Sequence, residues 1–116
     1  MTLTAAIYAR YSSDLQSIRS IEDQIALCRQ HLEQKSWTET VVYSDRAISG
    51  GAMVTRPGIQ ELIRGAANGH FNVVVSEALD RISRDQADTA TIYKILAFHG
   101  VSIVTLSEGE VDSMHV

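Results

Sequence analysis

Short apolar runs typical of β-strands alternate with helical patterns along this chain, and this alternation restricts the possible folds most strongly. The predicted strands lie near 5–11, 40–44, 72–76 and 101–106. Three helical patterns separate them, which is the order expected for a parallel sheet covered by helices. The chain has 116 residues, enough for one compact core. We therefore predict one α/β domain.

Cap and stop residues delimit the three predicted helices. The first begins after Ser20, and its apolar positions then recur at helical spacing. The second follows Thr55 as N-cap and stops at Gly69, whereas the third runs over about 83–98 and stops at Gly100. The glycine-rich stretch before the second helix, 45–54, is predicted to be a mobile loop.

Composition places the chain among globular proteins, with 45% hydrophobic and 21% charged residues. No apolar run is long enough to cross a bilayer, and Arg10 and Ser12 interrupt the opening apolar segment, so we expect no signal peptide. A cytoplasmic location is therefore predicted. The single cysteine, Cys28, has no partner for an internal disulfide and lies on the predicted buried face of the first helix. We interpret it as a core residue.

Polar and charged residues lie at or after the ends of several predicted strands. Tyr8, Arg10 and Ser12 alternate at the end of the first strand, so they share one face. The carboxyl ends of parallel strands meet at one edge, where sites gather. The other residues expected at this edge are Asp45 after the second strand, Arg56 at the start of the second helix, and Asp80, Arg81 and Arg84 after the third strand.

This pattern suits a hydroxyl group that attacks phosphate. Phosphoryl transfer needs cations around the equatorial oxygens and an aligned oxygen nucleophile. Several arginines beside one serine repel each other unless an anion sits among them. The formal net charge is −4, which argues against a nucleic-acid partner, but eight of the ten basic residues are arginines. A locally basic site on a protein of net negative charge is consistent with both the net charge and the number of arginines.

Each residue also has a simple structural interpretation. Ser12 suits a loop or a cap, and Asp45 suits the end of a strand. Asp80 and Arg84 have the spacing of a surface pair on a helix, worth about 0.3–0.5 kcal/mol. Tyr8 could be half-buried with its hydroxyl in solvent, and Arg56 could be a solvated residue of a first helical turn.

Five ordered segments resemble the catalytic domain of serine recombinases, the resolvases and invertases, over nearly the whole chain. Leu79-Asp80-Arg81-Ile82-Ser83-Arg84-Asp85 is the most specific, and Ser20-Ile21-Glu22-Asp23-Gln24 is most similar to the large serine recombinases. The others are Tyr8-Ala9-Arg10-Tyr11-Ser12-Ser13-Asp14, Tyr43-Ser44-Asp45 and Thr55-Arg56-Pro57-Gly58.

The resemblance implies a fold and a reaction. The fold is a three-layer, resolvase-like one, with a mainly parallel sheet of four to five strands in the order 2-1-3-4 and the fifth at an edge. Ser12 would attack a DNA phosphodiester, giving a 5′-phosphoserine linkage and a free 3′-hydroxyl, without metal or other cofactor. The matching phosphate-binding arginines are Arg10, Arg56, Arg81 and Arg84; Asp80 would position groups or move a proton, Asp45 would orient the arginines, and Tyr8, Gln16 and Gln24 match supporting positions.

The resemblance also implies partners that this segment does not carry. Family members continue into a long helix that forms the dimer interface and into a separate DNA-binding region. Residues 1–116 are therefore expected to be a truncated catalytic domain, whose full-length protein binds double-stranded DNA as a dimer and a synaptic tetramer. We expect this segment alone to bind DNA poorly and to be inactive, with mobile loops around Ser12 and 45–54.

Two other functions agree less well with the sequence than recombination does. A serine hydrolase is disfavoured because Ser12 lacks a Gly-x-Ser-x-Gly elbow and has no convincing histidine partner. A flavodoxin-like receiver or nucleotide-binding module would carry an acidic cluster or a glycine-rich loop after the first strand, where this chain has Arg-Tyr-Ser-Ser. A purely structural role is the remaining alternative. The general base stays unassigned, because none of the four histidines falls in the predicted cluster: His31, His70, His99 and His115.

Overall fold

The computed structural model describes residues 3–11, 20–46 and 56–112. The predictions for Ser12, Gln16, Thr55 and the loop at 47–54 therefore concern residues outside the described ranges, as does that for His115. The strands are β1 (Thr4–Tyr11), β2 (Thr38–Arg46), β3 (Val73–Ser76), β4 (Ser102–Thr105) and β5 (Gly109–Val111). The helices are α1 (Ile21–Lys35), α2 (Pro57–Ala67), α3 (Leu79–Ile82) and α4 (Gln86–Phe98).

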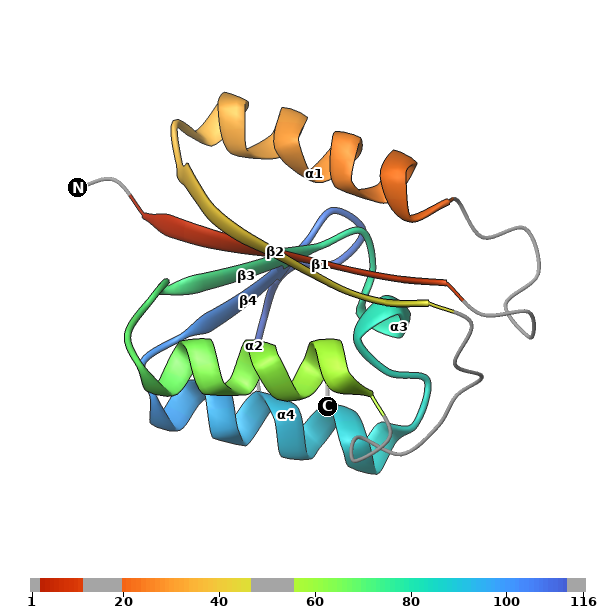
Figure 1. Ribbon diagram of the computed structural model, residues 1–116, viewed down its shortest axis with the longest axis vertical. Coiled ribbons are helices and arrows are strands. Elements are labelled where there is room, and N and C mark those ends of the chain that lie inside the picture. The colour runs from red at the N-terminus through yellow and green to blue at the C-terminus, as the bar shows by residue number, and fades with distance from the viewer. Residues whose placement is uncertain (1–2, 12–19, 47–55, 113–116) are drawn as a thin grey trace.

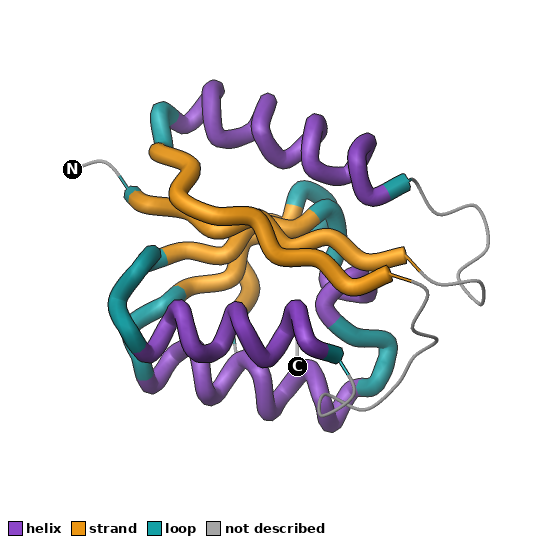
Figure 2. Tube along the Cα trace, in the orientation of Figure 1, coloured by secondary structure: helices purple, strands orange, loops and turns teal. Residues whose placement is uncertain are grey.

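One five-stranded sheet forms the middle layer, in the order β2-β1-β3-β4-β5. The first four strands are parallel, and β5 pairs antiparallel with β4 at the edge. Helix α1 covers one face and helices α2 and α4 cover the other (Figure 1). Figure 2 shows the sheet between these two helical layers. The predicted three-layer fold and strand order are confirmed.

Apolar side chains fill the space on both faces of the sheet. Strand β1 is buried on both, so Ala5 and Ile7 pack on the α1 side while Ala6 and Tyr8 pack on the opposite side. Cys28 is fully buried in the α1 layer, as predicted. Burial, followed by the charge of Glu77, raises the pKa of its thiol to about 12. This side chain is therefore a core residue and not a nucleophile at neutral pH.

Several predicted helix ends are confirmed. Ser20 is the N-cap of α1, and its hydroxyl accepts a hydrogen bond from the Asp23 amide at 3.1 Å. Gly69 and Gly100 follow α2 and α4 with φ of 74° and 75°, a conformation in which glycine avoids the strain of a side chain. The second strand extends to both sides of the predicted range 40–44.

The structure corrects two other helix boundaries. The helix predicted over 83–98 begins at Gln86 as α4, and an extended Ser83 separates it from α3, a one-turn helix that was not predicted. The Asp85 carboxylate caps α4, because it accepts from the amides of Ala87 and Asp88. The N-cap of α2 is Arg56 and not Thr55, and the Arg56 side chain makes no cap hydrogen bond. None of the described helices is long and apolar enough to cross a membrane.

Candidate active site

The carboxyl ends of β1, β2 and β3 bring the predicted site residues to one edge of the sheet. Tyr8 and Arg10 lie on β1, Asp45 pairs in register with Arg10 on β2, and α3 follows β3 after two residues. Arg56 joins them from the start of α2. The edge therefore collects side chains from four segments that are distant in the sequence.

Asp45 is the centre of a buried polar cluster beneath α2. Its Oδ2 accepts a hydrogen bond from the Tyr8 hydroxyl at 2.7 Å, and it lies 3.8 Å from Nε of Arg56. The same hydroxyl accepts from Nη2 of Arg56 at 2.6 Å, and the guanidinium lies over the Tyr8 ring, 5.6 Å from its centroid. Arg56 and Tyr8 expose at most 1% of their surface, so neither is solvated as the simple interpretation suggested.

The same carboxylate explains why α2 begins where it does. Asp45 Oδ1 accepts from the amide of Gly58 at 2.8 Å, and Oδ2 accepts from the amide of Ile59 at 3.1 Å. These two amides have no partner inside the helix, because they belong to its first turn. A carboxylate on β2 therefore replaces the cap that Arg56 does not supply, and this fixes α2 against the sheet.

Tyr8 stays a neutral phenol in this cluster. Burial raises its pKa far above the ordinary value, the Arg56 guanidinium opposes that change, and the Asp45 carboxylate adds to it. A neutral hydroxyl can donate to Asp45 and accept from Arg56 at once, which is the arrangement seen. Tyr8 therefore links an anion to a cation and has little capacity to accept a further proton.

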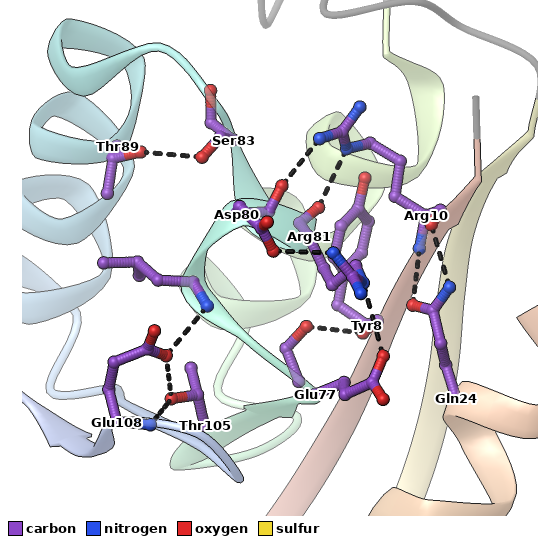
Figure 3. A network of polar contacts seen from close by, with 12 residues as sticks. Tyr8, Arg10, Gln24, Glu77, Asp80, Arg81, Ser83, Thr89, Thr105 and Glu108 are labelled. Atoms are coloured by element: carbon purple, nitrogen blue, oxygen red, sulfur yellow. Dashed lines mark hydrogen bonds and ion pairs between the residues drawn. The ribbon is translucent and has the colours of Figure 1, made fainter. Parts of the chain in front are cut away.

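Arg10 connects β1 to α3. Its Nε donates to the carbonyl oxygen of Arg81 at 2.9 Å, and its Nη2 donates to that of Asp80 at 2.6 Å (Figure 3). Gln24 holds the Arg10 main chain in both directions, accepting from its amide at 3.2 Å and donating to its carbonyl at 2.9 Å. Arg10 is 1% exposed, so its charge lies inside the protein and orients α3.

Arg81 lies between two carboxylates. Its Nη1 is 2.7 Å from Asp80 Oδ1, and its Nε is 3.3 Å from Glu77 Oε1. Asp80 is therefore paired with its neighbour Arg81, and it does not share a helix with Arg84, since α3 ends at Ile82. Carboxylates and carbonyl oxygens beside Arg10, Arg56 and Arg81 therefore offset part of the repulsion between these arginines.

Beside α3 lies an open groove of about 670 Å³. Asp80 and the exposed Arg84 line it on one side, and Glu108 of the β4–β5 turn lines it on the other. A phosphate group in this groove would lie next to both Asp80 and Arg84.

The structure thus brings together eight predicted residues, seven of them in two connected groups. Tyr8 and Arg10, two positions apart on β1, join them. The first group is Tyr8, Asp45 and Arg56, the second is Arg10, Gln24, Asp80 and Arg81, and Arg84 lies at the groove. His70 and His99 precede strands β3 and β4 and so lie at the opposite edge.

Two carboxylates of this edge escaped the sequence reasoning. Glu77 has the i, i+4 spacing to Arg81, a signal that was available, but Glu108 lies 29 residues from its partner Leu79 and has no local signal. Within the described ranges, no three acidic, histidine or cysteine side chains gather as metal ligands.

Known proteins share sequence with most of this chain. A family model described as "Resolvase, N terminal domain" matches residues 5–115. The transposon Tn552 DNA-invertase BinR of Staphylococcus aureus is 34% identical over 101 residues, which are 87% of this chain. The chain spans only 46% of that relative.

Solved structures show the same fold. The N-terminal catalytic domain of TP901-1 integrase superposes with a TM-score of 0.83 at 30% identity, covering 96% of this chain and 84% of that one. A resolvase family site-specific recombinase from Streptococcus pneumoniae gives a TM-score of 0.77 at 20% identity, covering 99% and 78%. The second likeness concerns the fold alone.

Proposed function

Because the chain belongs to the resolvase family of serine recombinases, we propose that it is the catalytic domain of a site-specific DNA recombinase with Ser12 as nucleophile. The observation that carries this proposal is the convergence of Arg10, Arg56 and Arg81 on the strand edge that leads into Ser12. The parent protein would continue beyond residue 116 into dimerisation and DNA-binding regions, since this chain covers less than half of the invertase relative.

In the proposed reaction, the Ser12 oxygen bonds to phosphorus as the phosphorus–O3′ bond breaks. The products are a 5′-phosphoserine linkage and a DNA end whose 3′ oxygen takes up a proton, while the serine loses one. Attack of that 3′-hydroxyl on the phosphoserine reverses the step and joins the strands. No net hydrolysis occurs, so strand exchange needs no external energy source.

The arginines divide into two roles. Arg81 and Arg84 lie close enough to solvent to receive phosphate oxygens, because the Arg81 side chain is 15% exposed and Arg84 lines the groove. The negatively charged equatorial oxygens of the phosphate would then replace the Asp80 carboxylate as the partner of Arg81. Arg10 and Arg56 are buried and already bonded, so they hold α3 and α2 in place around the phosphate.

A trapped covalent complex tests the nucleophile. The full-length protein is incubated with a duplex that carries its recombination site and a nick that prevents rejoining, and protein–DNA adducts are separated on a denaturing gel. We expect Ser12→Ala to abolish the adduct and Ser13→Ala, the matched control, to retain it. An adduct of undiminished yield with Ser12→Ala would exclude this assignment.

A further inference from the structure

Helix α3 is a single turn that carries Asp80 and Arg81 and has little stability of its own. It spans four residues, and its N-cap, Ala78, has no side chain that can accept a hydrogen bond. One isolated helical turn is unfavourable in water, because few hydrogen bonds offset the ordering of its backbone. Contacts from outside the helix must therefore fix its position.

Two side chains of opposite charge hold the two ends of α3. At the carboxyl end, Arg10 donates to the carbonyl oxygens of Asp80 and Arg81. At the amino end, Oε1 of Glu108 accepts from the amide of Leu79 at 3.0 Å. This is the arrangement that backbone dipoles favour, with an anion at exposed amides and a cation at exposed carbonyls.

Glu108 is itself held by the strand that precedes it. The hydroxyl of Thr105 donates to Glu108 Oε1 at 2.5 Å and accepts from the Glu108 amide at 2.9 Å (Figure 3). Thr105 is 1% exposed at the end of β4. Ser107, which directly precedes Glu108 in the turn, donates its amide to the carbonyl oxygen of Glu77 at 3.1 Å, two residues before α3 begins. The carboxylate is thus fixed toward the Leu79 amide and cannot swing freely into solvent.

We infer that Glu108 is a positioning residue of the recombination reaction, which acts through α3 by capping the Leu79 amide from the β4–β5 turn. This inference rests on the proposed function, because the importance of α3 depends on the roles of Asp80 and Arg81. Glu108 touches neither of those side chains in any described contact, so its effect passes through the helix backbone. Its loss leaves Arg10 as the remaining clamp and lets the amino end of α3 move.

Variants of the full-length protein test the inference through the rate of adduct formation at saturating nicked duplex, with duplex affinity measured separately. Glu108→Ala removes the acceptor and should lower the rate about five- to tenfold, the size that losing one helix N-cap gives, with affinity unchanged. Glu108→Asp keeps the charge but shortens the side chain, and should lower the rate similarly. Glu108→Gln keeps an acceptor oxygen and should recover most of the rate.

Glu110→Ala is the matched control, because Glu110 is exposed on β5 and its loss changes the net charge equally. Hydrogen exchange of the peptide covering 77–83 reports α3 directly and should accelerate in Glu108→Ala but not in Glu110→Ala. Unchanged rates in Glu108→Ala and Glu108→Asp would overturn the inference, as would a loss in Glu108→Gln or in Glu110→Ala as large as the loss in Glu108→Ala. Ser12→Ala in the same assay separates the two proposals, since an adduct that persists there contradicts the proposed function itself.

Discussion

At the scale of single residues, the Asp45 carboxylate connects β1, β2 and α2 at the candidate site. It accepts hydrogen bonds from Tyr8, Gly58 and Ile59, and it faces the buried guanidinium of Arg56. A charge of this kind is costly to bury, and removing one partner leaves the other charge without compensation. Asp45 therefore stabilises the domain as well as the site.

We predict that Asp45→Asn lowers the free energy of unfolding by about 3–5 kcal/mol, the range for breaking a buried ion pair. The amide keeps one acceptor oxygen, but its NH₂ group cannot accept from Tyr8 or Ile59. The midpoint of urea unfolding measures the loss. Glu22→Gln is the control, because it removes a carboxylate from an exposed pair with Arg46 and should leave the midpoint nearly unchanged. Equal shifts in the two variants would contradict the prediction.

Sequence reasoning placed Asp45 at this edge but did not predict its bonds to the amides of α2. Its position after a strand predicted the correct edge, because the carboxyl ends of parallel strands coincide. The partner amides of Gly58 and Ile59 belong to a helix thirteen and fourteen residues away, and only the packed structure shows which amides a carboxylate reaches. The burial of Arg56 was missed for the same reason, since its compensating charge comes from another element.

At the scale of elements, the contact of α2 with β2 sets the place of Arg56. Gly58 is buried in the first turn of α2, and a Cβ atom at this position would collide with the carbonyl oxygen of Ser44 and lie 2.9 Å from Asp45 Oδ2. Glycine therefore allows the helix backbone to touch the strand backbone. A side chain here would push the helix, and Arg56 with it, away from the sheet.

We predict that Gly58→Ala destabilises the domain by about 1–3 kcal/mol, as overpacking does. Gly65→Ala in the same helix is the matched control. Its Cβ would meet side-chain atoms of Tyr43 and Phe71, which can move, and replacing a mid-helix glycine contributes up to about 1 kcal/mol of helix propensity. Thermal unfolding of both variants measures the difference. A larger loss for Gly65→Ala than for Gly58→Ala would refute the backbone-contact explanation.

The break between α3 and α4 shows where helical periodicity fails as a predictor. Ser83 to Phe98 shows helical spacing, yet Asp85 begins a new helix by accepting from two amides, and Ser83 is extended. The Ser83 hydroxyl also accepts from the Asp85 amide at 3.1 Å. Serine and aspartate favour such local bonds over helix continuation, so these two residues were an available signal for a boundary.

At the scale of the whole molecule, the domain has a net negative charge and buries two of its arginine side chains. The formal net charge is −4, and Arg10 and Arg56 are each 1% exposed. Two of the exposed arginines, Arg29 and Arg46, are paired with Glu39 and Glu22. Few cations are therefore available to displace counterions from a DNA backbone.

We predict that this chain alone binds a labelled duplex with a dissociation constant no tighter than about 10⁻⁴ M at physiological salt, the weak end of non-specific binding. Fluorescence anisotropy measures the affinity, and the full-length protein on the same duplex is the control. The full-length protein should bind far more tightly, because the proposed DNA-binding region lies outside this chain. A micromolar constant for this chain alone would contradict the distribution of charge described above.

The order of elements was predictable because helices and strands alternate so regularly, whereas the short fifth strand was not evident from its own residues. Gly109–Val111 has three residues, too few to show a strand pattern, and it exists because it pairs with β4. Such pairing is a property of the assembled sheet. The location of the site was likewise predictable, because it follows from the order of strands and helices. The hydrogen bonds inside the site were not, because they depend on the packed structure.

The buried bonds of the site also join parts of the chain that meet only late in folding. Tyr8 lies 37 residues from Asp45 and 48 from Arg56, and Arg10 lies 70 and 71 residues from the carbonyls it holds. Contacts this distant form only when β1, β2, α2 and α3 have all docked. A partly unfolded chain therefore does not hold Arg10 or Arg56 in place. The proposed cleavage should therefore be lost whenever the native state is lost.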